Sequence, residues 1–259
     1  MDLGITGRRA FVLGASTGIG FEIAKQLLEA GASVTIAARY GDTIAVAAEQ
    51  LAGAGEVSAL VVDATEPASA ATLAAHFGDD TLDILVVAVG GSTRGRLDTL
   101  DDDDWHSSYE LNVLGPVRAI RALIPNVRRS HAGSILLIGA AASKMPYPNQ
   151  VISNVHKSGI LALVKTLALE LADDGIRVNA VAPGRTKTRL WLDRAANMAK
   201  ERGCTPEEIL EEFSEEIPMG RFGEPEEIAS VAVFVVSERA SYMTGQNISV
   251  DGGIARGLL

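Results

Sequence analysis

The sequence predicts a single α/β domain of the doubly wound type, in which helices cover both faces of a parallel sheet. Short aliphatic runs, which are typical of buried parallel strands, alternate along the chain with longer segments of helical periodicity. No internal repeat or low-complexity linker interrupts this alternation, so no domain boundary is expected. The length of 259 residues suits one such domain, and a hydrophobic content of 47% supplies enough apolar surface for its core.

In the first half of the chain the predicted elements form three strand and helix pairs, followed by a fourth strand. Each strand is a run of β-branched or aliphatic residues: 10–13, 33–38, 57–62 and 84–89. The helices that follow the first three strands have apolar residues at intervals of three and four: 19–30, 43–52 and 68–77. Strands and helices in this order predict right-handed crossovers between parallel strands.

The second half continues the alternation with longer helices. Helical spacing of apolar residues predicts helices at 102–127, 153–172 and 225–236. Aliphatic runs between and after them predict strands at 134–138, 177–181 and 247–250. The alternation therefore extends to the end of the chain, as a doubly wound sheet requires.

The segment 185–218, between the sixth predicted strand and the last predicted helix, is an irregular insertion. It sets Trp191, Met198 and Phe213 among charged residues. Ligands of open α/β sheets bind beyond the carboxyl ends of the strands, where this segment should lie. We therefore expect a lid for a small-molecule substrate that is partly apolar; a plain surface excursion or a contact between subunits is the alternative.

A glycine-rich turn follows the first predicted strand and opens the first predicted helix. Its candidate cofactor-binding residues are Gly14, Ser16, Thr17, Gly18, Ile19 and Gly20. Gly14 permits the tight turn, Gly18 lets the backbone approach a pyrophosphate, and Gly20 allows the helix to pack closely on the strand. The phosphate would lie at the helix N-terminus, where main-chain N–H groups are free. A turn in this context predicts a dinucleotide site.

The spacing Gly-x-x-x-Gly-x-Gly of this turn resembles that of the short-chain dehydrogenase/reductase family. Further matches extend over nearly the whole chain: Asp63 after the third strand, Trp105 seven residues before Asn112, Asn112-x-x-Gly115, Pro183-Gly184-x-x-x-Thr188 and the tail 245–253. The segment 220–229 is especially similar to β-ketoacyl reductases and their relatives. The resemblance implies a Rossmann-type fold, an NAD(P)-dependent oxidoreductase, and a homotetramer or homodimer.

By this resemblance several residues would line the cofactor. Asp63 would contact the adenine amine, Thr188 the nicotinamide carboxamide, and Lys157 the hydroxyls of the nicotinamide ribose. The resemblance also assigns to the cofactor site Ala64, Gly90, Pro183 and Gly184. Asp63 and Thr188 have a simpler alternative, which is to cap the elements that follow them.

The end of the second predicted strand bears on the choice between NADP(H) and NAD(H). Ala38 stands where NAD-dependent members of the family often carry an aspartate, which would repel a 2′-phosphate. Arg39 follows it and can make a charge-assisted contact with that phosphate. NADP(H) is therefore favoured over NAD(H); a solvated arginine at a strand end is the alternative.

The chain departs from the family at the residues that handle the substrate carbonyl. The family carries Tyr-x-x-x-Lys, and the matching stretch here runs from Ser153 to Lys157 without a tyrosine. Ala140 stands in register where the family has a serine that bonds to the carbonyl. Residues 87–90 read Val-Ala-Val-Gly in place of the usual Asn-Asn-Ala-Gly. Asn112 and Lys157 are kept, so the chain resembles a divergent subgroup that lacks the catalytic serine and tyrosine.

Reduction of a carbonyl needs a proton donor, and an aliphatic hydroxyl such as that of Ser153 is far less acidic than a phenol. The nearby candidates are Ser143, Tyr147, His156, Lys157 itself, and a water ordered by Asn112 and Lys157. Tyr147 lies in the stiff stretch 145–148, Met-Pro-Tyr-Pro, which should border the site. Ser143 offers a shifted hydrogen bond to substrate. His156, roughly 100° around the helix from Lys157, is expected against a neighbouring helix or subunit.

Ser153 is interpreted first as a small side chain that enlarges the substrate pocket, and second as a nucleophile activated by Lys157 one helical turn later. Three functions remain open. The first is NADPH-dependent reduction of a carbonyl or enone with a non-standard proton donor. The second is a lyase, dehydratase or aldolase-like reaction on the same frame. The third is a catalytically silent subunit that binds nucleotide or a partner.

Composition bears on partners and location. The net charge is −10 and no compact basic patch is visible, so nucleic acid is not an expected partner. Cys204 is the single cysteine, which excludes an internal disulfide. No signal peptide or membrane span is visible, so a cytoplasmic location is the simplest expectation. No metal site is expected. The helices 102–127 and 153–172 are the expected subunit contacts. Their apolar stripe, which packing on the sheet requires equally, comprises Ile160, Leu163, Leu167 and Leu171.

Overall fold

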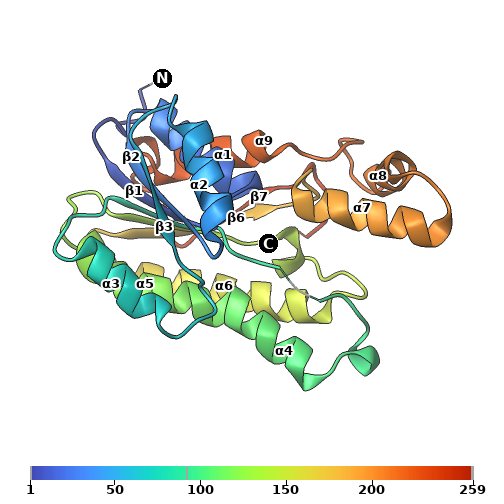
Figure 1. Cartoon of the computed structure of the whole chain (residues 1–259). Helices are drawn as coiled ribbons and strands as arrows, with labels where there is room; N and C mark the ends of the chain where they lie inside the picture. Colours follow the sequence, from blue (N-terminus) through green and yellow to red (C-terminus); the bar gives the residue numbers. More distant parts are fainter. Residues whose placement is uncertain (1, 92, 258–259) are drawn as a thin grey trace.

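The computed structural model describes residues 2–91 and 93–257. Seven parallel strands form one sheet in the order β3-β2-β1-β4-β5-β6-β7, with helices on both faces (Figure 1). The strands are β1 (Arg9–Leu13), β2 (Ser33–Ala38), β3 (Val57–Val61), β4 (Ile84–Val87), β5 (Ser134–Ile138), β6 (Arg177–Pro183) and β7 (Asn247–Val250). Each predicted strand is present within two residues of its expected ends, which confirms the doubly wound α/β fold.

The strand order reverses beside β1, and this reversal positions the site. Leu13 pairs with Ala37 of β2 and with Val87 of β4. The carboxyl ends of these three strands are therefore level, and the loops that leave them start at one edge of the sheet. Connections on the two sides of the reversal run to opposite faces, which opens a crevice for a ligand between them.

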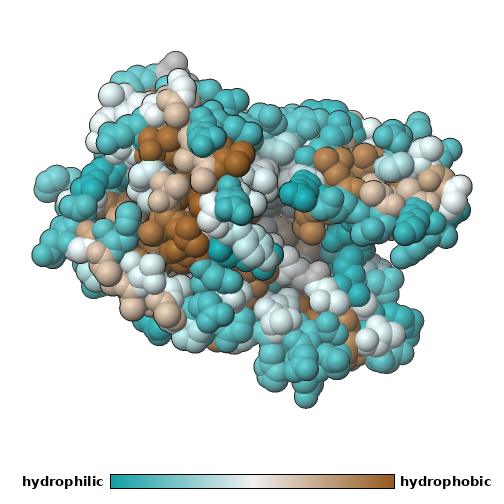
Figure 2. Space-filling model, viewed as in Figure 1, coloured by the Kyte–Doolittle hydropathy of each residue, from teal (hydrophilic) through white to brown (hydrophobic). Residues whose placement is uncertain are grey.

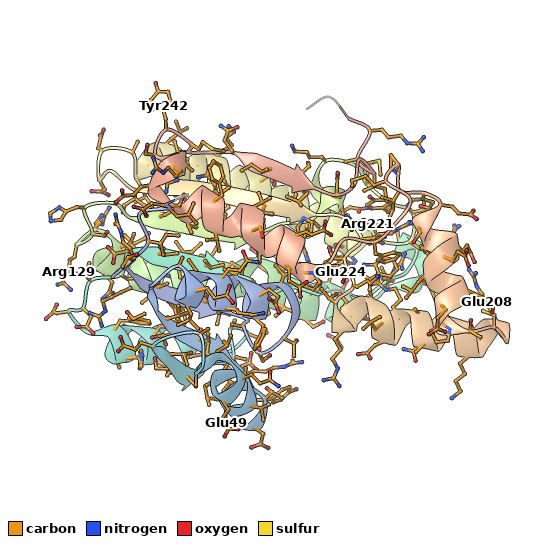
Figure 3. The ribbon with its side chains drawn as sticks, turned by 90° about the horizontal axis from the view of Figure 1, so that it is seen from above. Glu49, Arg129, Glu208, Arg221, Glu224 and Tyr242 are labelled. Carbon is orange, nitrogen blue, oxygen red and sulfur yellow. The ribbon has the colours of Figure 1, made fainter. Side chains whose placement is uncertain are left out.

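Two layers of helices enclose the sheet (Figure 1). One face carries α1 (Gly18–Glu29), α2 (Gly41–Leu51) and α9 (Pro225–Val236). The other carries α3 (Ser69–Phe77), α5 (Gly115–Val127) and α6 (Val151–Glu170), with α4 (Asp102–Tyr109) beside α6. Figure 3 shows α1 and α9 next to each other, with Arg221 and Glu224 at the start of α9.

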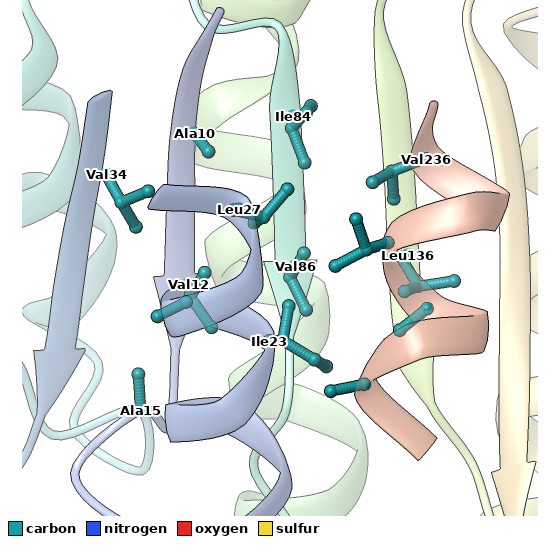
Figure 4. Packing of buried hydrophobic residues seen from close by; sticks show 14 of the residues in the cluster. Ala10, Val12, Ala15, Ile23, Leu27, Val34, Ile84, Val86, Leu136 and Val236 are labelled. Atoms are coloured by element: carbon teal, nitrogen blue, oxygen red, sulfur yellow. The ribbon is translucent and has the colours of Figure 1, made fainter. Parts of the chain in front are cut away.

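The core under α1 and α9 is a continuous apolar layer. Ile23 and Leu27 of α1 pack with Val12 and Val86 of the central strands, and Val236 extends the layer beneath α9 (Figure 4). All five side chains are almost fully buried. Burial of each such side chain contributes roughly 1.5–3 kcal/mol to folding, so the central strands are firmly held.

The long helix predicted over 102–127 is divided into three parts. A π-helical turn, Glu110–Leu114, separates α4 from α5. Pro116 has no N–H to donate to the main-chain carbonyl of Asn112, four residues earlier, and so interrupts the regular ladder. The Asn112 side chain also bonds to the main chain at Ser108 O, 2.8 Å away. The turn thereby brings Asn112 into the site.

The insertion 185–218 is mostly helical, which corrects the expectation that it is irregular. It contains α7 (Arg189–Arg202) and α8 (Pro206–Ser214), which project from one end of the sheet (Figure 1). The start of α8 is a capping box in which the side chains of Thr205 and Glu208 each accept a hydrogen bond from the other's main-chain N–H. Both helices carry many charged residues, so the spacing of their few apolar residues did not predict them from the sequence.

The predicted apolar stripe of α6 packs on the sheet within the chain. Ile160 and Leu171 are buried, and Leu163 and Leu167 are packed against the same core. The opposite face leaves Val155 and Leu169 exposed, at 52% and 80%. Across residues 2–91 and 93–257, no helix has both the length and the apolar character that a bilayer span requires.

Candidate functional site

A cavity of about 530 Å³ opens at the carboxyl ends of the strands. Residues that follow five of the strands line it: Gly14, Arg39, Gly90, Ala140 and Gly184. Trp191 and Arg194 of α7 and Phe213 of α8 line it as well. Figure 2 shows the molecule hollowed between its main body and the α7 and α8 pair. The cavity is therefore a crevice between the sheet edge and the insertion.

The residues that the sequence assigns to the cofactor come together in this cavity. Its lining includes Gly14, Ser16, Thr17, Gly18, Ile19, Gly20, Arg39, Asp63, Ala64, Gly90, Lys157, Pro183, Gly184 and Thr188. Of the candidate catalytic residues, Asn112, Tyr147, Ser153 and Lys157 line it, and Ser143 does not. Ala140, where the family has its serine, lies in the same wall.

The glycine-rich turn packs without room for side chains. A Cβ on Gly14 would lie 2.9 Å from the carbonyl carbon of Ala88, and a Cβ on Gly20 would lie 2.1 Å from the carbonyl oxygen of Gly14. The helix α1 begins at Gly18, and its N-cap residue Thr17 makes no side-chain cap hydrogen bond. No acidic side chain stands in the first turn. The free N–H groups and the positive end of the helix dipole are thus available to an anion in the cavity.

Arg39 and Asp63 border the cavity where β2 and β3 end. The exposed Arg39 guanidinium stacks on the Tyr40 ring, 4.6 Å from its centre. The Asp63 carboxylate accepts hydrogen bonds from Thr65, at 2.9 Å from N and 2.7 Å from Oγ1. Burial alone would raise the pKa of Asp63, but these bonds and the charge of Arg39 outweigh it and hold the pKa below its usual value. Asp63 therefore stabilises the turn at Thr65 while it faces the cavity.

Thr188 lies beside the glycine-rich turn. It occupies the N-cap position of α7, but its side chain makes no cap hydrogen bond. A Cβ on Gly18 would lie 3.5 Å from the Thr188 methyl group. Its hydroxyl is thus left available at the cavity wall.

Lys157 forms the floor of the cavity. Its amine is buried and donates to the carbonyl of Ile138 at 3.2 Å, and burial lowers the pKa of the amine to about 8. Among the described residues, no carboxylate lies within ion-pair distance of it. A Cβ on Gly90 would stand 2.8 Å from this amine, so Gly90 leaves the nitrogen accessible from the cavity.

Asn112 is fixed beside Lys157 by several hydrogen bonds. Its side-chain amide donates to the carbonyls of Gly91 and Ser108, and its side-chain oxygen accepts from the N–H of Gly91 at 3.3 Å. This oxygen would lie 3.4 Å from a Cβ on Gly90. The side chain therefore ties the loop after β4 to the π-helical turn and keeps the cavity floor rigid.

Tyr147 reaches the cavity from a loop that α6 holds in place. The Asn154 side chain donates to the Tyr147 carbonyl at 2.9 Å and accepts from its N–H at 3.3 Å. Burial raises the pKa of the Tyr147 phenol above its usual value, which leaves it protonated at neutral pH. The phenol is thus a weaker acid than a tyrosine in water.

Ser143 and His156 point elsewhere. The Ser143 hydroxyl donates to the carbonyl of Ala140 at 2.6 Å and accepts from the Asn247 amide at 3.4 Å. The His156 ring is buried against Trp105 and Tyr109, with ring centres 5.7 Å and 5.6 Å away. Burial, and then the charge of Lys157, lower the pKa of His156. Its place against α4 agrees with the expected packing on a neighbouring helix.

Sequence reasoning missed a cluster of arginines in the cavity wall. Arg94 comes from the loop after β4, Arg185 from the end of β6, and Arg194 from α7. Arg94 and Arg185 each follow a predicted strand closely, which would have placed both at the carboxyl edge of the sheet. No comparable signal identified Arg194, because the helix that carries it was not predicted.

The sequence that forms this cavity is similar to known proteins over most of its length. The enoyl-(acyl carrier protein) reductase family model matches residues 14–255. The chain belongs to the short-chain dehydrogenase/reductase family. A relative within this family is the rhamnolipids biosynthesis 3-oxoacyl-(acyl-carrier-protein) reductase of Pseudomonas aeruginosa, which is 36% identical over 256 residues and covers 96% of each chain.

Solved structures of short-chain dehydrogenases/reductases match over the whole chain. L-sorbose reductase from Gluconobacter frateurii, in complex with NADPH and L-sorbose, is 34% identical, with a TM-score of 0.94 and coverage of 100% of both chains. The complex of Pseudomonas aeruginosa RhlG with NADP is 35% identical, with a TM-score of 0.90 and coverage of 98% of this chain and 100% of that one. Their cofactors support the preference for NADP(H) over NAD(H) that Ala38 and Arg39 predict.

Proposed function

We propose that this chain is an NADPH-dependent reductase of a carbonyl or an enone that works without the usual tyrosine donor. The observation that supports this most strongly is the buried Lys157 amine, which faces the cavity with no carboxylate partner in the described part of the chain. An unpaired buried cation costs folding free energy, so its retention in a cavity indicates a function. The glycine-rich turn in the same cavity supplies the place for a dinucleotide.

The residues present fit NADPH. The N-terminus of α1 suits a pyrophosphate, because no side chain caps its main-chain N–H groups and no acidic residue stands in its first turn. Arg39 would meet the 2′-phosphate, Thr188 the carboxamide, and Lys157 the ribose hydroxyls. When bound, NADPH supplies the hydride for the reduction.

The chain's own residues must then stabilise the negative charge on the substrate oxygen and return a proton to it. The ammonium group of Lys157 places a positive charge in a buried site, where it is worth more than in water. With its pKa near 8, this group can hold a proton at neutral pH and also release it. Ala140 and Ser153 leave room in the wall for a water.

We therefore assign proton delivery to Lys157, acting through a water that occupies the space a tyrosine would fill. Tyr147 is the second candidate, since its phenol is protonated and lines the cavity. Ser143 is bonded inside the protein, so we assign it to holding the turn after β5. Residues 185–218 form the substrate lid through α7 and α8.

The decisive test follows NADPH oxidation with a panel of ketones, enones and β-keto thioesters. Lys157→Ala should lower kcat by at least about 100-fold, because both charge stabilisation and proton transfer are lost. Lys165→Ala, which removes an exposed lysine of the same helix, is the matched control. Product without net consumption of NADPH would favour the lyase class. NADPH binding without any turnover would favour a silent subunit.

We also infer that two or more copies associate through the outer face of α6. Val155 and Leu169 are exposed on this face, and Tyr109 of the neighbouring α4 is 42% exposed. Apolar side chains that lie fourteen residues apart share one face of a helix, so Val155 and Leu169 mark the same side of α6 toward its two ends. A homodimer built on this face would leave the cavity of each copy intact.

A further inference from the structure

Five arginines line the cavity in a chain whose net charge is −10, and three of them are partly buried. Arg94 follows β4, Arg185 follows β6, and Arg194 lies in α7. All three line the cavity and are partly buried. A cluster of one sign in a concave site, against an acidic background, marks a place where a ligand of the opposite sign is attracted.

One of the three is already neutralised. The Arg185 guanidinium donates to the carboxylate of Glu216 and to the main-chain carbonyl of Phe213. It therefore fastens the end of α8 to the loop after β6. These bonds inside the protein account for the charge of Arg185 without a bound ligand.

Arg94 and Arg194 lack such partners. Within 2–91 and 93–257, neither guanidinium makes an ion pair or donates a hydrogen bond. Burial, and then the charge of Arg185, lower the pKa of Arg94. Burial, followed by the charges of Arg94 and Arg185, lowers the pKa of Arg194 to about 10, so it stays charged at neutral pH. Among the described residues, no ion pair or hydrogen bond thus offsets the cost of holding these like charges near each other.

The Arg194 guanidinium and the main chain beside Arg94 are held in position. Arg194 stacks on Trp191, 4.5 Å from the ring centre, and Trp191 packs edge-on against Phe213 and Phe222. The loop that carries Arg94 is fastened to the segment before α6, where the N–H of Gly95 donates to the carbonyl of Asn149 at 3.1 Å. Positioned guanidinium groups with free N–H donors match the planar or tetrahedral oxygens of an oxyanion.

We propose that Arg94 and Arg194 bind an oxyanion of the substrate, a carboxylate or a phosphate, at a position other than its reacting carbon. This specifies the substrate of the reductase proposed above and relies on it for the identity of the reacting group. The aromatic rings of Trp191 and Phe213 then contact the carbon chain between the two groups. The phosphates of the dinucleotide have their own partners, the N-terminus of α1 and Arg39.

The test compares anionic probes with neutral ones of the same carbon skeleton. Acetoacetate and its methyl ester form one pair, and dihydroxyacetone phosphate and dihydroxyacetone form the other. Each probe is titrated by calorimetry into the protein saturated with NADP⁺, and its reduction by NADPH is followed separately. At least one anion should bind more than about tenfold tighter than its neutral partner, and the pair that does so separates carboxylate from phosphate.

Arg94→Gln and Arg194→Gln should each weaken binding of that anion by about 10- to 100-fold. The affinities for the neutral probe and for NADP⁺ should stay within about twofold of those of the unaltered protein. Arg96→Gln and Arg202→Gln are matched controls, since both arginines are exposed, pair with Asp98 and Glu212, and lie outside the cavity. Far-ultraviolet circular dichroism verifies that each variant is folded.

Two results overturn the inference: equal or absent binding of anionic and neutral probes, and a loss of NADP⁺ affinity in the arginine variants that matches the loss of anion affinity. Anion binding that depends on Arg94 and Arg194 without reduction of any probe would support the inference while rejecting the reductase. Reduction without preference for the anion would support the reductase and reject the inference.

Discussion

Lys157 shows how one buried side chain links stability to activity. Its folded-state pKa of about 8 lies below the usual 10.5, so between these values the unfolded chain binds a proton that the folded chain does not. Stability therefore rises with pH across this window, and at neutral pH the buried amine costs at most roughly 3 kcal/mol. The protein tolerates this cost because the charge is available to the cavity.

Lys157→Met should accordingly stabilise the apoprotein at neutral pH while it abolishes reduction. The gain, up to roughly 3 kcal/mol, should shrink as the pH rises above about 8, because the native lysine is then neutral. Urea unfolding at several pH values measures it, with Lys165→Met as the exposed control. A gain that does not change with pH would contradict the depressed pKa.

At the level of elements, Arg185 connects the insertion to the sheet. Its bonds to the Phe213 carbonyl and the Glu216 carboxylate anchor the end of α8. Arg185→Ala should raise hydrogen exchange in residues 206–214 by about tenfold or more, because charged hydrogen bonds contribute roughly 1.5–3 kcal/mol. The KM for substrate should rise, since Phe213 and Trp191 line the cavity.

An increase in hydrogen exchange that is confined to α8 would distinguish the loss of this anchor from unfolding of the whole protein. Arg202→Ala, which removes the exposed pair with Glu212 between the two helices, is the comparison. Exposed pairs contribute little, so this variant should change exchange far less. Equal effects of the two variants would show that Arg185 has no special anchoring role.

The elements also show where sequence-based prediction succeeds. The strands and the glycine-rich turn are determined by local patterns, so they were predicted nearly to the residue. The division of 102–127 depends on the missing N–H of Pro116 together with the side-chain bonds of Asn112, which a periodicity does not contain. Helices α7 and α8 were missed because their apolar residues form a small separate core with few members.

The candidate site divides in the same way. The gathering of the candidate cofactor residues in one cavity was predictable, because they belong to short motifs that follow individual strands. The proximity of Arg94 to Arg194 was not predictable. The two residues are far apart in the chain, and Arg194 belongs to α7, a helix that the sequence pattern did not predict. Ser143 was wrongly expected in the cavity. Its hydroxyl instead donates to the carbonyl of Ala140 within a local turn, and no sequence pattern indicates this bond.

For the whole molecule, the outer face of α6 predicts assembly. Leu169→Asp combined with Val155→Asp should shift the particle mass, measured by light scattering, to that of the 27.1 kDa monomer. A charge inside an apolar contact carries a desolvation cost that the contact cannot offset. Leu97→Asp, at an exposed position outside α4 and α6, should leave the mass unchanged. A monomeric native protein would refute the proposed association.

The pair of helices α7 and α8 has a core of its own, built on Ala195, Ala199 and Ile209. Among its side chains toward the cavity, Phe213 packs against this core, and Trp191 packs in a second small cluster with Phe222, apart from the two layers that hold the sheet. Substitutions there need not disturb the strands or the glycine-rich turn. Under the proposed function, substitutions on these two helices, residues 189–214, should change substrate choice while Thr188 and the glycine-rich turn keep the cofactor. The two helices then become a unit that can be exchanged between reductases to transfer specificity.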